Sequence, residues 1–211
     1  MFWLLLQMQN DSLIFHGTMT NKKIFNVLFQ KKSVAAPKAK AMEYTIPRWQ
    51  AVAPTYPEAV QKVLDALEAS RPFYNYRKNE IDGKHLRETE RKKELMSKLT
   101  ADRDGFITFH AQMGTQYTGK SVKEARELFG EKEFGLGAYE VGCILFAHAD
   151  LLKSSDDLFI DCAGDEFHDP QRSDAPFDLA PIFFFVGDKL GFGTGWYSLA
   201  DVYYGSATGF I

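Results

Sequence analysis

The chain has 211 residues, of which 45% are hydrophobic and 25% are charged, and its formal net charge at pH 7 is −3. With only two cysteines, Cys143 and Cys162, it cannot be a disulfide-rich scaffold, and two reduced, buried thiols are expected. It also contains no apolar run of the roughly 20 residues that a membrane-spanning helix needs. We therefore expect a soluble protein that does not span a membrane.

Residues 1–42 differ in composition from the rest of the chain. They hold six lysines and one acid, Asp11, for a net charge of +5, so residues 43–211 must carry −8. A basic, acid-poor segment rich in small residues is typical of an organelle import leader, and its Ala, Pro, Lys and Ser content slightly favours the plastid over the mitochondrion. The absence of arginine counts against a standard leader. A retained basic arm, upstream sequence added by a misplaced start codon and a cytoplasmic location stay open.

Residues 43–211 have the usual length of a single domain. Three helices are predicted from start signals and apolar spacing: residues 55–71, which begin at Thr55-Tyr56-Pro57-Glu58, residues 84–99, and residues 121–130 with capping-box spacing. Residues 138–153 are apolar on most sides and form either a buried helix or a buried strand followed by a turn, and their length favours the helix, which makes four. The 84–99 helix is expected to be mostly charged and solvated. In the 121–130 helix, Val122, Ala125, Leu128 and Phe129 are expected to face inward.

Strand-like runs follow the helices. They cover residues 158–160, 181–186, 190–196 and 202–204, and an earlier strand is predicted at 106–110. The turn 187–189 joins two of these strands as a hairpin with a three-residue loop. The sequence thus predicts an α+β domain in which N-terminal helices pack on a C-terminal, mainly antiparallel sheet.

Charge within the domain argues against binding to nucleic acid. Residues 136–211 hold twelve acids and three basic residues, a net charge of −9, and such a surface repels phosphate backbones. Only residues 71–99, which are rich in Arg and Lys, could oppose this. We expect no nucleic-acid partner.

Two acidic segments could bind a metal ion. Asp102 to Ile107 is similar to the middle of an EF-hand calcium loop, but Thr100 and Ala111 stand where calcium ligands are required, so an Asp-rich turn explains the residues as well. Residues 156–169 include Asp161, Asp165, Glu166 and His168 near the end of a predicted strand, a ligand set that suits Mn, Mg or Zn. A solvated loop at a sheet edge is the simpler interpretation, and no metal or cofactor is predicted.

Two further segments are candidates for a catalytic or a phosphate-binding site. Cys143 follows Gly142 at the head of an apolar segment, and His110, His148 or His168 could serve as its base, although a cysteine among apolar residues is usually part of the core. The glycine-rich run 191–196 misses the dinucleotide spacing by one residue, and alternating glycines on a strand instead leave room for aromatic neighbours. The sequence assigns no catalytic residue.

Three functions from different classes are consistent with these features. The first is a non-catalytic interaction or accessory domain with a protein partner, such as a subunit of an organellar assembly, because Tyr and Trp concentrate near the C-terminus. The second is a hydrolase-like enzyme that uses Cys143 or the 156–169 acids. The third is a small-ligand binding module with an aromatic pocket. The first is the leading hypothesis.

Overall fold

The computed structural model describes residues 8–9, 12–13, 41–171 and 177–211. The basic segment 1–42 therefore lies almost entirely outside the described residues, and its role as a leader or arm stays a prediction. The elements in chain order are β1 (Met8–Gln9), β2 (Ser12–Leu13), β3 (Met42–Pro47), α2 (Trp49–Val52), α3 (Tyr56–Ser70), β4 (Phe73–Asn75), β5 (Leu86–Glu88), α4 (Glu90–Ser97), β6 (Phe106–Met113), α5 (Val122–Leu128), β7 (Glu133–Gly135), α6 (Ala138–Ala147), β8 (Phe159–Asp161), β9 (Asp165–Phe167), β10 (Leu179–Val186), β11 (Lys189–Trp196) and β12 (Tyr204–Phe210). Short 3₁₀ turns occupy Thr115–Tyr117 and Ala149–Leu151.

One large mixed sheet organises the domain. Its main path runs β3-β6-β12-β8-β10-β11-β4, with β5, β7 and β9 pairing at the side. Most neighbours are antiparallel, while β12 pairs parallel with β8 and β11 pairs parallel with β4. The last strand, β12, lies inside the sheet, between β6 and β8. The α+β class and the mainly antiparallel sheet predicted from the sequence are confirmed.

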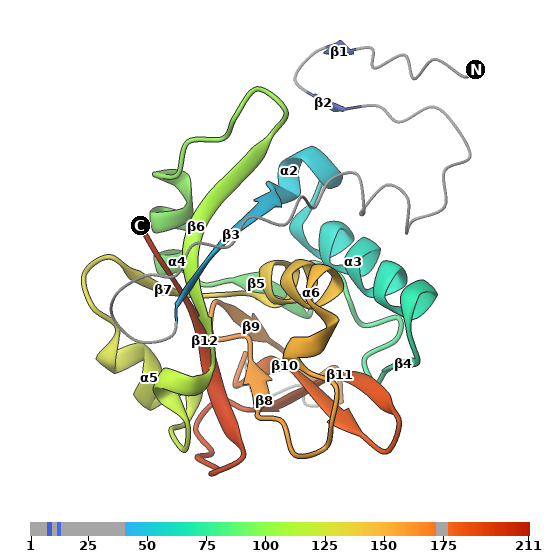
Figure 1. Cartoon of the computed structure of the whole chain (residues 1–211), viewed down its shortest axis with the longest axis vertical. Coiled ribbons are helices and arrows are strands. Elements are labelled where there is room, and N and C mark those ends of the chain that lie inside the picture. The colour runs from blue at the N-terminus through green and yellow to red at the C-terminus, as the bar shows by residue number, and fades with distance from the viewer. Residues whose placement is uncertain (1–7, 10–11, 14–40, 172–176) are drawn as a thin grey trace.

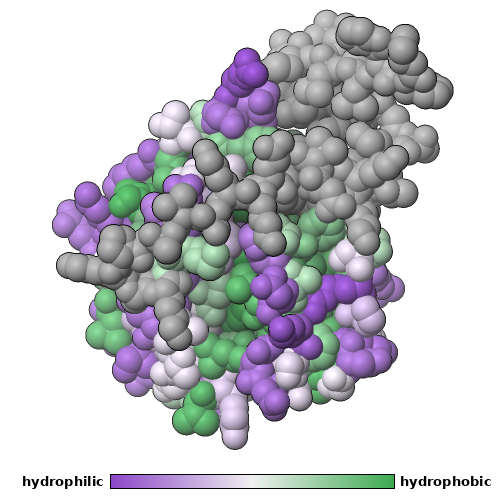
Figure 2. All heavy atoms as spheres, viewed as in Figure 1, coloured by the Kyte–Doolittle hydropathy of each residue, from purple (hydrophilic) through white to green (hydrophobic). Residues whose placement is uncertain are grey.

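Helices α3 and α6 pack against each other and lie in front of the sheet in the view of Figure 1. Gly142 makes this close approach possible, because a Cβ at this position would lie 2.5 Å from Cγ1 of Val63 on α3 and 3.4 Å from the ring of Phe183 on β10. On this face Figure 2 shows hydrophobic residues near the centre, with hydrophilic residues around them. Because the ring of Phe183 packs against Gly142 of α6, the side of the sheet that carries Phe183 is the side that these helices cover.

The predicted helices are confirmed in three of four places. Helix α3 begins at Tyr56, α5 has the expected capping box at Ser121, and the apolar segment from Ala138 forms α6. The fourth, residues 84–99, is wrong in its first half, because Leu86 is buried and pairs with Phe167 in a sheet. The helix starts only at Glu90, after Thr89 accepts a hydrogen bond from the Lys92 amide.

Several local predictions are also corrected. Leu128 is 55% exposed because α5 ends there, so it does not face inward. The β10–β11 hairpin has a two-residue loop, since Val186 pairs with Lys189, and Gly187 has φ of +62°. The last strand starts at Tyr204, and Tyr203 lies in the exposed turn before it. Strands and helices also alternate more than predicted, because β3, β4 and β5 precede most of the helices.

Among the described residues, no helix combines the length and the apolar character needed to cross a bilayer.

Candidate functional site

The most unusual feature of the interior is a lysine that is completely buried. Lys92 on α4 is 0% exposed, and its Nζ lies 2.7 Å from Glu140 Oε2, 3.2 Å from Asp165 Oδ1 and 3.3 Å from Glu88 Oε1. It also donates to the Tyr56 hydroxyl at 2.8 Å and lies 4.2 Å from the centre of that ring. One ammonium group is therefore surrounded by three carboxyl groups and a phenol. We call these five residues the Lys92 centre.

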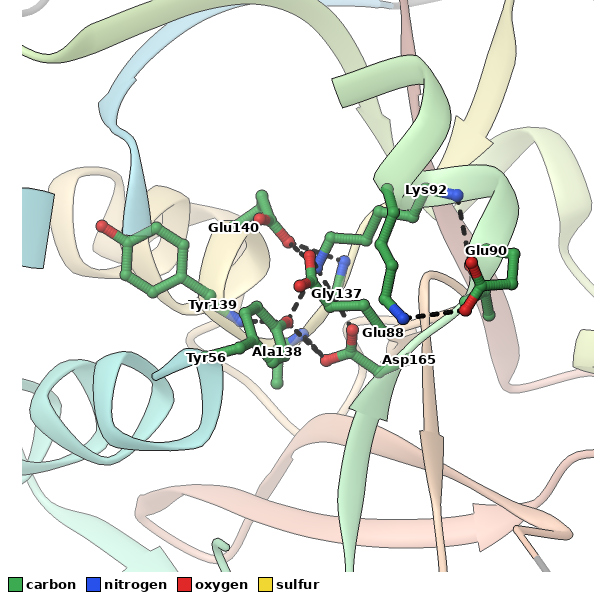
Figure 3. A network of polar contacts seen from close by, with 11 residues as sticks. Tyr56, Glu88, Glu90, Lys92, Gly137, Ala138, Tyr139, Glu140 and Asp165 are labelled. Carbon is green, nitrogen blue, oxygen red and sulfur yellow. Dashed lines mark hydrogen bonds and ion pairs between the residues drawn. The ribbon is translucent and has the colours of Figure 1, made fainter. Parts of the chain in front are cut away.

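The Lys92 centre is fixed by the start of α6. Asp165 Oδ2 accepts from the Tyr56 hydroxyl at 2.6 Å and from the Ala138 amide at 2.7 Å, while Glu140 Oε2 accepts from the Gly137 amide at 2.9 Å. Figure 3 shows these side chains converging from α3, α4, α6 and β9. Backbone amides at a helix start favour negative charge. Both carboxylates are therefore stabilised by these amides as well as by the Lys92 ammonium.

The protonation of the centre follows from its charges. Burial alone would lower the pKa of Lys92, but the surrounding Asp165, Glu140 and Glu88 carboxylates outweigh it and raise that pKa. Burial raises the pKa of Glu140, and the neighbouring carboxylates add to the effect because a single ammonium cannot neutralise them all. The surroundings therefore favour the charged form of Lys92 and the protonated form of Glu140.

A cavity of about 250 Å³ lies beside the Lys92 centre. Two carboxyl groups of the centre, those of Glu88 and Glu140, belong to residues that line it. The remaining lining residues come from β3, α2, α4, β6 and α6: Pro47, Arg48, Trp49, Gln50, Lys93, Met96, Ser97, Ile107 and Tyr139. The wall thus combines apolar and aromatic groups with a few charged ones, which is the usual make-up of a small-molecule site.

A second candidate surface lies on the side of the sheet opposite Phe183. Aromatic rings contact one another in a row across it, with centroid distances of 4.5 Å for Tyr74–Tyr76, 5.6 Å for Tyr76–Phe184, 5.3 Å for Phe184–Phe159 and 5.0 Å for Phe159–Tyr204. These residues come from β4 and the segment after it, β10, β8 and β12. We call this row of five residues the aromatic face. Tyr74 and Tyr76 are more than half exposed.

The alternating glycines of β11 accommodate the aromatic face. A Cβ at Gly191 would lie 2.6 Å from the Phe184 ring, and one at Gly193 would lie 3.3 Å from it. At 2.6 Å the Cβ would overlap the ring, so position 191 has no room for a side chain. The geometry agrees with the sequence interpretation that these glycines make space for aromatic neighbours.

Asp161 lies on the same side of the sheet as the aromatic face, because its register partners are Ile182 on β10 and Ser206 on β12. Its side chain is nearly enclosed, with a residue exposure of 5%. Burial penalises the carboxylate and raises the pKa of Asp161 to about 7. A carboxyl group in this state gains its charge near neutral pH.

Replacing Asp161 with asparagine is expected to remove a pH-dependent loss of stability. Because the folded-state pKa is raised from 3.8 to about 7, the contribution of the protonated group is complete below about pH 4 and is lost as the pH rises through 7. One pKa unit corresponds to about 1.4 kcal/mol. The free energy of unfolding of the variant, relative to that of the wild type, should therefore increase by a few kcal/mol between about pH 5 and 8. Urea unfolding of both proteins across this range checks the difference, and a pH-independent difference would contradict it.

The acidic window at 156–169 does not form one cluster. Asp165 belongs to the Lys92 centre, and Asp161 lies in the sheet. Glu166 forms ion pairs with Arg87 at 2.8 Å and Arg126 at 3.6 Å. His168 stacks on His85 at the other end of β9, with centroids 6.2 Å apart. Within the described ranges, no group of three or more His, Cys, Asp or Glu has the geometry to hold a metal ion.

The residues weighed for nucleophilic catalysis are in the wrong environment for it. Cys143 is completely buried in the middle of α6, not at its start, and burial raises the pKa of its thiol well above the usual value. An activated cysteine needs the opposite shift. His148 ends the same helix and packs edge-on against Tyr44 at 5.4 Å. Cys162 is likewise free and buried.

The segment from Asp102 to Ile107 is a tight turn into β6. The Asp102 carboxylate accepts from the amides of Asp104 and Phe106, both at 2.9 Å, and Gly105 has φ of +83°. The carboxylate is therefore engaged in holding its own loop, as expected for an Asp-rich turn.

Sequence reasoning missed the Lys92 centre. Lys92 stands in a run of charged residues that resembles a solvated helix face, and its partners Glu140 and Asp165 are distant in the chain. One signal was present: Glu140 is the only charged residue in the apolar stretch 138–149, and a buried charge requires a partner.

No protein-family model, no curated protein and no solved structure matches this chain significantly.

Proposed function

We propose that the chain is a non-catalytic interaction domain that docks onto a protein partner through the aromatic face. The observation that carries this proposal is the ring-to-ring row from Tyr74 to Tyr204, which lies on the side of the sheet away from the α3–α6 pair. Tyr is enriched at the centres of protein interfaces because it buries a large apolar area with little loss of conformational freedom.

The turn next to this row extends the apolar surface. Leu199, Val202 and Tyr203 are 64%, 71% and 70% exposed and lead directly into Tyr204. A large exposed apolar patch marks an interaction site more often than isolated apolar residues do.

The charge of the surroundings favours a basic partner. Asp161 lies on this side of the sheet and Asp201 belongs to the adjoining turn, within a segment, residues 136–211, whose net charge along the sequence is −9. A second copy of this chain would bring the same negative charge to the contact, so like charges disfavour self-association there. We propose that the partner is a subunit of a larger assembly and that it binds this acidic accessory domain through a positively charged surface. The organellar setting of that assembly is part of the same proposal.

Replacing Tyr76 and Tyr203 together with serine is expected to release the protein from its partner. Loss of two exposed aromatic contacts at an interface centre costs about 2 kcal/mol or more each, which is about a 30-fold weaker affinity per residue. The measurement is the native size of a tagged full-length chain in its source cells, wild type against double variant. The wild type should migrate in a complex and the variant near the 24.0 kDa of one chain.

Leu128→Ser provides the matched control, because Leu128 is 55% exposed on α5 and belongs neither to the aromatic face nor to the turn that adjoins it. It should leave the complex intact. A photo-crosslinker at position 76 then identifies the contacted segment, which should be rich in Lys and Arg. A wild-type chain that migrates as a free monomer, or a purified chain that forms a dimer through position 76, would overturn the proposal.

A further inference from the structure

We propose that a single arginine side chain of the partner enters the aromatic face at Asp161, where its guanidinium group pairs with the carboxylate and stacks on the Tyr204 ring. This inference rests on the proposed function, because it names the chemistry that the aromatic face recognises in its basic partner. The two remain separable, since binding of an arginine side chain can be measured on the purified chain without any partner.

Asp161 has a carboxyl group that the fold encloses and leaves without a cation. The residue is 5% exposed, and no described residue forms an ion pair or a hydrogen bond with its side chain. Ser206 stands directly beside it on β12, and the buried hydroxyl of Ser206 likewise has no hydrogen-bond partner within the described ranges. A buried carboxylate without a partner is costly, so a ligand that supplies a cation is favoured at this position.

Both oxygens of the Asp161 carboxylate remain within reach of solvent. The described side chains include polar atoms that are fully enclosed and unpartnered, such as Oγ of Ser206 and Oε1 of Glu133, but neither oxygen of Asp161 belongs to this group. Since these two oxygens have no hydrogen-bond partner either, the small exposed part of Asp161 includes its carboxylate. A group that arrives from solvent can therefore contact it.

The ring beside this carboxylate is that of Tyr204. A Cβ at Gly195 on β11 would lie 4.0 Å from Cε1 of this ring and 3.8 Å from Cγ2 of Ile182. Ile182 is the register partner of Asp161, so the Tyr204 ring extends from β12 over the part of the sheet that holds Asp161. Burial raises the pKa of Tyr204, and the Asp161 carboxylate adds to this effect, as expected for neighbouring groups.

The same chain shows how a ring and a carboxylate together bind a guanidinium group. Arg87 lies over the Phe177 ring, 3.7 Å from its centroid, and its Nε donates to Glu166 at 2.8 Å. Asp161 and Tyr204 offer the same two groups. A guanidinium suits them better than an ammonium does, because its fork can reach both carboxylate oxygens while its plane stacks on the ring.

The test on the purified full-length chain is an NMR titration with the peptide acetyl-Gly-Arg-Gly-amide, in which the ring signals of Tyr204 are followed. The peptide should shift these signals. A peptide with citrulline in place of arginine lacks the charge and should bind at least about tenfold more weakly. A peptide with lysine lacks the planar fork and should also bind more weakly. Absence of binding by the arginine peptide, or equal binding by either analogue, would overturn the inference.

Asp161→Asn locates the site, because asparagine keeps the shape of the side chain and removes its charge. The variant should bind the arginine peptide at least about tenfold more weakly. It is expected to fold, since it loses an unpaired buried charge. Asp188→Asn is the matched control: Asp188 lies in the exposed turn between β10 and β11, so this variant has the same net charge and should bind as the wild type does. Equal weakening in both variants, or undiminished binding in Asp161→Asn, would contradict a contact at Asp161.

The native complex separates this inference from the proposed function. The full-length Asp161→Asn chain should be released from the complex in its source cells, as the double variant at Tyr76 and Tyr203 is. Release of the double variant with retention of Asp161→Asn would overturn this inference and leave the docking proposal standing. A wild-type chain that binds the arginine peptide but migrates as a free monomer would overturn the docking proposal, and with it the partner's arginine, while the guanidinium site itself stands.

Discussion

Replacing Lys92 with methionine is expected to lower the free energy of unfolding by about 3–5 kcal/mol. Methionine has a similar length and fills the space, but it leaves the carboxyl groups of Glu88, Glu140 and Asp165 buried without their cation. The loss arises from these uncompensated charges and not from packing. Urea unfolding of the variant and the wild type at neutral pH measures it.

The loss at Lys92 should also depend on pH. Without the ammonium, the carboxyl groups are harder to ionise in the folded state, so their folded-state pKa values rise and the variant loses stability as the pH increases. The deficit should therefore be larger at about pH 8 than at about pH 5. Lys98→Met is the control: Lys98 is half exposed, it pairs with Glu94, and its loss should cost less than about 1 kcal/mol. An equally small loss at Lys92 would show that the buried ion cluster contributes nothing to stability.

Gly164→Ala is expected to destabilise the fold strongly. An added Cβ would lie 2.2 Å from the carbonyl oxygen of Gly135 and 2.8 Å from the carbonyl carbon of Leu136. These are backbone atoms, so no side chain can rotate away to relieve the contact. We expect a loss at or above the upper end of the usual overpacking cost of about 1–3 kcal/mol.

The position of Gly164 explains the size of this effect. Its amide donates to the Leu136 carbonyl at 2.8 Å, and its carbonyl accepts from the Thr89 amide at 2.8 Å. A shift of Gly164 would move the adjacent Asp165 and, with it, the Lys92 centre. Gly83→Ala is the matched control, because a Cβ there meets nothing within 4 Å, and its thermal midpoint should stay close to that of the wild type. Equal midpoints for both variants would show that the backbone at Gly164 yields easily.

Local signals in the sequence predicted those elements that depend on local chemistry. The Pro57 and Glu58 start of α3 and the Ser121–Glu124 capping box both reappear in the structure, because caps and first-turn charges act within a few residues. The 84–99 segment failed because its first part is held by a strand, β9, that lies about 80 residues away in the chain. A strand of three residues is too short to show the alternation of apolar and polar residues that identifies a strand, and its distant partner cannot be recognised from the local sequence.

The candidate site was less predictable than the fold. The tyrosines at the C-terminus indicated a binding surface, but Tyr74 and Tyr76 complete the aromatic face from an unrelated part of the chain. The burial of Lys92 could not be deduced from α4, where the neighbouring Lys93 and Lys98 are half exposed. Only the acid within α6 indicated that a cation had to reach the core.

The place of β12 has a consequence for synthesis of the protein. Residues 204–210 join the β3–β6 side of the sheet to the β8–β10–β11–β4 side, so a nascent chain cannot assemble the full sheet before this segment has been made. Until then the strands next to it, β6 and β8, have open edges that can pair with other chains. Pairing across so much of the chain is also slow. We therefore expect chaperones to bind the growing chain until β12 has been synthesised.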